Sequence, residues 1–248
     1  MNQLTGVERL AALLRESGRT VALTGAGISV PSGIPDFRSP GTGLWEKVDP
    51  MEVAHIDVFL NDPARFWSYY RPRFGMLSDK VPNPAHRALA RLEEQGMLDA
   101  VVTQNIDTLH RKAGSRKVVE VHGTIDTGSC WTCGRTYPRD DIESLFDPEG
   151  IARCACGGHV KPDVVLFGEM LPETAMLEAH ALCERADLLL CVGTSLEVYP
   201  VAGLPSVTRS AGGAVAIVTK GPTPYDADAE VRLDGDVVEE LEALLRLL

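Results

Sequence analysis

TVALTGAGISVPSGIPDFRS, residues 20–39, is the stretch that decides the fold of this chain. Thr20 to Leu23 predict a short buried strand, which breaks at Gly25 and Gly27 into a loop where backbone can approach a ligand closely. In α/β proteins a loop of this kind binds phosphates, because free backbone N–H groups at the start of the next helix favour anions. The segment therefore predicts a nucleotide site.

The loop departs from the usual dinucleotide-binding fingerprint. Val30 stands where the pattern G-x-G-x-x-G has its third glycine, and no second strand precedes the position, about 20 residues on, where a ribose-binding acid is expected. A plain dehydrogenase therefore fits poorly. Residues 35–38, PDFR, instead place an acid, an aromatic ring and a guanidinium side by side on a loop, where functional residues are common.

Strands and helices alternate along the rest of the chain. Apolar runs predict strands at 100–103, 118–121, 187–192 and 214–218, and residues 164–167 are again apolar. Periodicity and capping residues predict helices at 4–14 (closed by Gly18), 83–95, 108–113 and, after Asp236, to the end of the chain. Residues 41–82, rich in aromatics and prolines, predict short helices. We expect an α/β fold with a parallel sheet covered on both faces and two inserted segments.

The formal net charge of −11 over 248 residues disfavours binding to nucleic acid or to an anionic membrane. No apolar run approaches the ~20 residues of a membrane span, and the N-terminal sequence lacks a basic region followed by an apolar core. We expect a cytoplasmic protein, monomeric, without nucleic-acid or membrane partners.

Four of the six cysteines form two close pairs, Cys130-x-x-Cys133 and Cys154-x-Cys156. Four thiolates saturate a tetrahedral zinc and leave no position for water, so the sequence predicts one structural zinc. Within residues 130–156 five acidic residues outnumber three arginines, which disfavours a zinc ribbon that follows phosphates. Cys183 and Cys191 lie in apolar contexts and are predicted core residues.

Two further groups of polar residues follow predicted strands. Residues 104–107, QNID, lie at the carboxyl end of strand 100–103, where open parallel sheets bind ligands. His122 follows strand 118–121 and precedes a glycine. Its imidazole titrates near neutral pH and could serve as a general base, while a histidine packed at a strand end is the alternative. His86 and His110 lie on predicted helices and are interpreted as caps or packing residues.

Taken in order, six motifs of this chain resemble the sirtuins, NAD-dependent protein-lysine deacylases, in their bacterial and archaeal form. They span nearly the whole sequence: GAGISVPSGIPDFRS (25–39), TQNIDTLH (103–110), VHG (121–123), the four paired cysteines, KPDVVLFGE (161–169) and GTSLEVYP (193–200).

The resemblance implies a Rossmann-like NAD-binding domain (1–34, 83–123 and 162–248) and a smaller domain (35–82 and 124–161) made of a helical module and the zinc module. Thr219 stands where the family commonly has an asparagine near the adenosine ribose. The NAD contacts implied are Gly25, Ala26, Gly27, Asp36, Phe37, Arg38, Gln104, Asn105, Ile106, Asp107, Gly193, Thr194, Ser195, Thr219 and Val237.

The implied chemistry moves an acetyl group from lysine to ADP-ribose and releases nicotinamide. His122 is the implied general base on the ribose hydroxyls, and Asn105 is the second implied catalytic residue. The acylated peptide is expected to add as a strand between Phe167-Gly168-Glu169 and the segment around Val198.

Other activities stay open at the sequence level. Tyr70-x-x-Arg73, with Ala54 nearby, resembles the motif of sirtuins that remove succinyl or malonyl groups. In that motif a guanidinium binds the carboxylate of the acyl group, for which its geometry is well suited. Pro72 inside the motif could redirect Arg73. The further alternatives are a mono-ADP-ribosyltransferase and a noncatalytic NAD-binding or zinc module.

Overall fold

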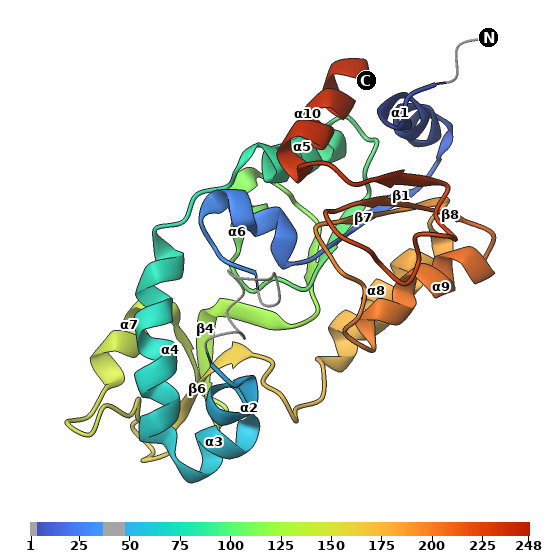
Figure 1. Ribbon diagram of the computed structural model, residues 1–248. Helices are drawn as coiled ribbons and strands as arrows, with labels where there is room; N and C mark the ends of the chain where they lie inside the picture. Colours follow the sequence, from blue (N-terminus) through green and yellow to red (C-terminus); the bar gives the residue numbers. More distant parts are fainter. Residues whose placement is uncertain (1–3, 37–47) are drawn as a thin grey trace.

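The computed structural model of the protein describes residues 4–36 and 48–248. Figure 1 shows a larger part built around a parallel sheet and a smaller part in which helices lie beside a second, small sheet. None of the helices within the described ranges combines the length and the apolar character that crossing a membrane requires.

The large sheet has six strands in the order β3-β2-β1-β7-β8-β9, and every neighbouring pair is parallel. The predicted α/β fold with a parallel sheet is therefore confirmed. The chain moves outward in opposite directions from β1 and β7, so a crevice opens at their carboxyl ends. The last strand, β9, escaped the sequence analysis. The strands are β1 Thr20–Thr24, β2 Ala100–Thr103, β3 Val118–Glu120, β7 Leu188–Val192, β8 Ala214–Val218 and β9 Val231–Leu233.

Helices cover both faces of this sheet because its strands bury side chains on both sides. In β7, Leu188 and Leu190 belong to the core under α1, α5 and α10, whereas Leu189 and Cys191 belong to the core under α8 and α9. The sequence of a strand that is buried on both faces is a continuous apolar run. Cys183 and Cys191 are fully buried, as predicted. The helices are α1 Gly6–Glu16, α5 Pro84–Glu94, α6 Leu109–Ala113, α8 Glu173–Arg185, α9 Leu204–Ser210 and α10 Val237–Leu247.

Most predicted helix ends agree with the structure. The Asn83 side chain accepts a hydrogen bond from the Ala85 amide at the start of α5, and Asp236 does the same for the Val238 amide at the start of α10. The first helix differs from its prediction. Leu4 precedes the N-cap residue and is 64% exposed, so it does not belong to the buried face. The helix ends with Ser17 as its C-cap, directly before Gly18, the residue predicted to close it.

The smaller part joins a three-stranded antiparallel sheet, in the order β5-β4-β6, to a group of helices. Its core brings Phe59, Phe66 and Trp67 against the small sheet, and the Trp67 indole donates to the Val160 carbonyl at 3.2 Å. The described part of the aromatic-rich segment, residues 48–82, forms helices as predicted, but α4 is 16 residues long and continues through Pro72. The elements are α2 Pro50–Val53, α3 Ile56–Asn61, α4 Pro63–Ser78, β4 Gly123–Cys130, β5 Thr136–Pro138, α7 Arg139–Ile142 and β6 Val160–Val164.

The loops that follow β1 and β7 touch through their backbones. The loop after β1 winds into a 3₁₀ helix, Ala26–Ser32, and its Gly27 amide donates to the Gly193 carbonyl at 2.8 Å. Gly193 has a φ of 61°, and a Cβ at this position would lie 2.2 Å from the Ile28 nitrogen. Only glycine fits there, because both the backbone angle and the contact exclude a side chain.

We expect Gly193→Ala to destabilise the protein far more than Gly212→Ala. Gly212 also has a positive φ, 93°, but a Cβ there would meet nothing within 4 Å. Gly212→Ala should therefore cost only about 1–2 kcal/mol for the left-handed backbone. Gly193→Ala adds a backbone clash to that cost, and the difference is measured by denaturant unfolding. Equal losses in the two variants would contradict the close packing of these loops.

Candidate active site

The carboxyl end of β2 places a buried group of polar side chains in the crevice. The Asn105 amide nitrogen donates to the Gly25 carbonyl at 3.0 Å and to the Ser29 hydroxyl oxygen at 3.1 Å. Ser29 in turn donates to the Asp107 carboxylate at 2.6 Å. Residues predicted from two separate motifs therefore meet at one serine. Sequence analysis missed Ser29, although it lies inside the glycine-rich motif.

Asp107 is held ready to accept hydrogen bonds. One carboxylate oxygen accepts a hydrogen bond from the Ser29 hydroxyl, and the other accepts one from the Leu109 amide at 2.9 Å. Burial raises the pKa of Asp107, whereas these two donors lower it. The two donors fix the orientation of this buried carboxylate, so it can accept a further hydrogen bond from a ligand in a defined direction.

Gln104 connects the ends of three strands. Its backbone amide donates to the Thr24 carbonyl at 3.0 Å, and its side-chain nitrogen donates to the Thr194 hydroxyl at 2.9 Å. Gly25, Ala26 and Gly27 follow β1, and Gly193, Thr194 and Ser195 follow β7. The structure therefore brings three predicted groups of residues to the same edge of the sheet.

His122 lies half-buried between β3 and β4, beside the same crevice. Its Nδ1 is 3.0 Å from the Gln104 carbonyl, which can only accept, so Nδ1 carries the proton. The other ring nitrogen, Nε2, is then unprotonated. Burial lowers the pKa of His122, and this favours the neutral ring. The arrangement suits a general base.

Two buried histidines support the floor from below. The His110 Nε2 lies 2.9 Å from the Thr24 hydroxyl, the His86 Nε2 lies 3.4 Å from the Ser29 hydroxyl, and the two rings pack edge to face at 4.9 Å. Burial lowers the pKa of His86 to about 4 and that of His110 to about 3. Both rings are neutral at pH 7 and act as packed polar supports, which agrees with their interpretation as packing residues.

The segment predicted to hold a peptide is anchored to the helical module through the backbone of Phe167. The Phe167 amide donates to the Ala54 carbonyl and its carbonyl accepts from the Ile56 amide, both at 2.9 Å. Gly168 has a φ of 85°, and a Cβ there would lie 2.7 Å from the His55 ring. Backbone therefore runs close against the helical module at this point. On the opposite segment, the Val198 carbonyl accepts from the Ala202 amide at 2.9 Å.

Tyr70 and Arg73 lie on α4 but make separate contacts. The Arg73 guanidinium lies 3.3 Å above the ring of Tyr69 and donates to the Tyr69 carbonyl at 2.6 Å. Tyr70 stacks on Phe66 with ring centroids 4.4 Å apart, and burial raises its pKa. In this arrangement the Arg73 guanidinium packs on Tyr69.

The other predicted NAD contacts are placed as follows. The Thr219 amide donates to the Leu233 carbonyl at 3.1 Å, and Val237 is 6% exposed in the core at the start of α10. The Ile106 carbonyl accepts from the Ile125 amide at 3.2 Å. Asp36 is the last described residue before the gap, and Phe37 and Arg38 lie outside the described residues.

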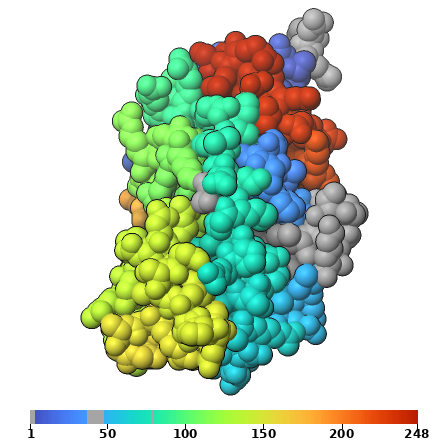
Figure 2. Space-filling view, turned by 90° about the vertical axis from the view of Figure 1, so that its left-hand side faces the viewer, coloured from blue at the N-terminus to red at the C-terminus, as the bar shows by residue number. Residues whose placement is uncertain are grey.

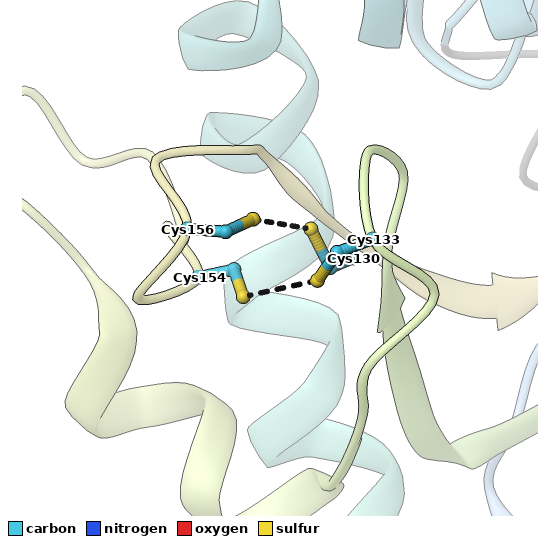
Figure 3. Close-up of side chains that lie close together, drawn as sticks. All are labelled: Cys130, Cys133, Cys154 and Cys156. Carbon is cyan, nitrogen blue, oxygen red and sulfur yellow. Dashed lines mark hydrogen bonds between the residues drawn. The ribbon is translucent and has the colours of Figure 1, made fainter.

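The four paired cysteines meet as the sequence predicted. Figure 3 shows their sulfur atoms pointing toward one another, with Cys130 and Cys156 at 3.5 Å and Cys133 and Cys154 at 3.6 Å. All four sulfurs lie within 4.8 Å of one another. Zinc–sulfur bonds of about 2.3 Å in a tetrahedron require sulfurs about 3.8 Å apart, so this donor set fits zinc. The Tyr137 hydroxyl supports the cluster by donating to the Cys154 sulfur at 3.0 Å.

The sequence and the fold match one protein family throughout. The sequence model of the Sir2 family matches residues 25–200. An NAD-dependent protein deacetylase of Thermotoga maritima is 45% identical over 228 residues, 92% of each chain. NAD-dependent protein deacylase 2 of Archaeoglobus fulgidus is 43% identical over 244 residues, 96% of this chain and 94% of the relative.

Solved Sir2 structures have the same fold. One, with a deacetylated peptide and 3′-O-acetyl-ADP-ribose, is 41% identical with a TM-score of 0.92 and covers 97% of each chain. Another, bound to a propionylated peptide, is 40% identical with a TM-score of 0.89 and covers 98% of each.

We expect one zinc per chain, held by these cysteines, and loss of the folded zinc module when the metal is removed. Cys156→Ser should lower the zinc content measured by native mass spectrometry, because an alcohol replaces a thiolate ligand. Cys183→Ala, which alters a cysteine buried in the α8 core, should keep the full zinc content. Full zinc content in Cys156→Ser, or an unchanged fold in metal-free protein, would contradict a structural zinc.

Proposed function

This chain belongs to the Sir2 family, the sirtuins, and on that basis we propose that it is an NAD-dependent protein-lysine deacetylase. The observation that supports this best is His122, whose Nε2 is unprotonated beside the buried group formed by Asn105, Ser29 and Asp107. No nucleophilic side chain is required, since the acyl oxygen of the lysine attacks the ribose carbon that bears nicotinamide. One water molecule is consumed, and the products are free lysine, nicotinamide and O-acetyl-ADP-ribose.

His122 acts as the general base of this reaction. With its Nδ1 proton fixed on the Gln104 carbonyl, Nε2 would be free to accept a proton from a ribose hydroxyl of bound NAD, which would assist transfer of the acyl group to the sugar. The neutral ring is available at pH 7 because burial lowers its pKa. The Gln104 carbonyl fixes the tautomer, and so fixes which nitrogen receives the proton.

The residues at the floor bind and orient the dinucleotide. Asp107 accepts from the nicotinamide carboxamide, and Asn105 lines the nicotinamide ribose. The loops after β1 and β7 supply backbone N–H groups and the hydroxyls of Thr194 and Ser195 on the phosphate and adenosine side. Thr219 and Val237 would contact the adenosine side and Asp36 the nicotinamide ribose, while the predicted contacts Phe37 and Arg38 lie outside the described residues.

The acylated peptide adds as a strand beside Gly168. The peptide pairs with the segment Phe167-Gly168-Glu169 on one side and with the segment around Val198 on the other. Backbone pairing of this kind accepts many sequences, which suits an enzyme whose substrates are acyl-lysines in different proteins.

The remaining assignments concern the whole molecule. We place the protein in the cytoplasm, where thiols that bind a metal stay reduced, and take it to be a monomer without nucleic-acid or membrane partners. Zinc stabilises the small domain and takes no part in the reaction. We propose that the NAD-binding domain and the small domain meet at residues 34/35, 82/83, 123/124 and 161/162. The last of these boundaries falls inside β6.

We expect His122→Ala to lower deacetylation at least about 100-fold, the usual contribution of a general base. His180→Ala, an exposed histidine on α8, is the matched control and should keep full activity. In the wild type, kcat/KM should be flat near neutral pH and fall only below about pH 6.5, because protonation of His122 requires a pH below its lowered pKa. Full activity in His122→Ala, or an acid limb centred above pH 7, would refute this role.

We expect acetyl-lysine to be preferred over succinyl-lysine in the same peptide, and Arg73→Ala to leave this preference unchanged. The reason is that the Arg73 guanidinium packs on Tyr69. Mass spectrometry of the products gives both rates, and Arg65→Ala on the same helix is the control. A succinyl preference that disappears in Arg73→Ala would assign the protein to the deacylases of acidic acyl groups. NAD consumption without deacylation would instead indicate ADP-ribosyl transfer.

A further inference from the structure

Lys161 carries a buried charge that the proposed reaction does not use. It lies on β6 within the motif KPDVVLFGE and is 8% exposed. Its Nζ donates to the carbonyls of Pro162 at 3.1 Å and Val164 at 2.7 Å, and to the Glu169 carboxylate at 3.0 Å. An ammonium has three protons, so each one has an acceptor. A charge buried in this way persists only when it is paired.

Glu169 uses the same carboxylate oxygen to close a turn. Its Oε2 accepts from the Leu166 amide at 2.8 Å as well as from Lys161, and the Glu169 amide donates to the Leu166 carbonyl at 3.1 Å. The turn therefore spans residues 166–169 and contains Phe167 and Gly168. Its shape depends on a carboxylate whose charge Lys161 neutralises, since this side chain is only 17% exposed.

The residues before the turn are tied directly to the general base. The Val165 amide donates to the His122 carbonyl at 2.9 Å, and Lys161 bonds the carbonyl of the adjacent Val164. At Gly123 the approach is so close that a Cβ would lie 2.0 Å from the Asp163 carbonyl oxygen. The ammonium of Lys161 thus links the backbone that holds His122 to the turn beside which the peptide would lie.

We propose that Lys161 is a positioning residue: its ion pair with Glu169 sets the turn 166–169 in register with His122, so that a bound acyl-lysine meets the general base. The proposal rests on the function proposed above. It predicts that peptide binding depends on Lys161 and that dinucleotide binding does not. Lys161 governs the peptide side, whereas the dinucleotide side is built from the loops after β1, β2 and β7, which it does not contact in the described part of the chain.

Three variants test this assignment in the full-length, zinc-loaded protein. Lys161→Met keeps the length of the side chain but removes its charge, and Lys161→Arg keeps the charge. Lys117→Met is the matched control, because Lys117 forms an exposed pair with Glu178 at 3.8 Å. The readouts are the KM for an acetyl-lysine peptide, the Kd for ADP-ribose, and hydrogen exchange at the Val165 and Leu166 amides.

We expect Lys161→Met to raise the peptide KM about 10- to 100-fold, as small displacements in a site do, while the Kd for ADP-ribose stays at the wild-type value. The Val165 and Leu166 amides should exchange faster in this variant. Lys161→Arg should restore most of the loss, and Lys117→Met should behave as the wild type. If Lys161→Met does not fold, Glu169→Gln provides the same hydrogen-exchange test.

Other outcomes would overturn the proposal. They are an unchanged peptide KM in folded Lys161→Met, a parallel loss of ADP-ribose binding, equal effects of Met and Arg at position 161, or unchanged exchange at both amides. Failure of the proposed function is distinguishable, because wild-type protein would then not deacetylate the peptide at all. The exchange of the Val165 and Leu166 amides would still report whether Lys161 holds the turn.

Discussion

The fold of the active site depends on the contact between two loop backbones, those that follow β1 and β7. Gly27 donates to Gly193 across this contact, and neither of these two glycines leaves room for a side chain. The contact joins the loops at the carboxyl ends of the two central strands and sets the start of the 3₁₀ helix that carries Ser29. The polar floor and the proposed dinucleotide site are both built on this geometry.

Burial gives the polar residues of the floor their chemical character. Ser29, Asn105 and Asp107 are each at most 8% exposed, so their hydrogen bonds act in a medium of low polarity and hold fixed directions. The same burial keeps His86 and His110 neutral and lowers the pKa of His122. Of these three histidines, only His122 is half-buried, which distinguishes the proposed general base from two buried supporting rings.

The smaller part contributes position rather than chemistry. The zinc site and the aromatic core around Trp67 stabilise the sheet β5-β4-β6. In Figure 2 this part forms the lower half of the molecule, with the zinc module beside α4. From β6 the chain passes His122 and enters the turn that contains Gly168, so the small sheet is continuous with the segment proposed to bind the peptide. The buried pair of Lys161 and Glu169 is the local link between them.

The sequence by itself determined the parallel sheet, the four cysteines of the zinc site and the main motifs of the crevice, because each depends on local spacing or on an unbroken apolar run. It left β9 and Ser29 unnoticed, since a strand of three residues and one serine in a loop carry no periodic signal. Only the tertiary structure decided which residues meet. Ser29 joins Asn105 to Asp107, Gln104 fixes the His122 tautomer, and Arg73 packs on Tyr69, because these contacts connect elements or orient side chains in ways that residue spacing does not encode.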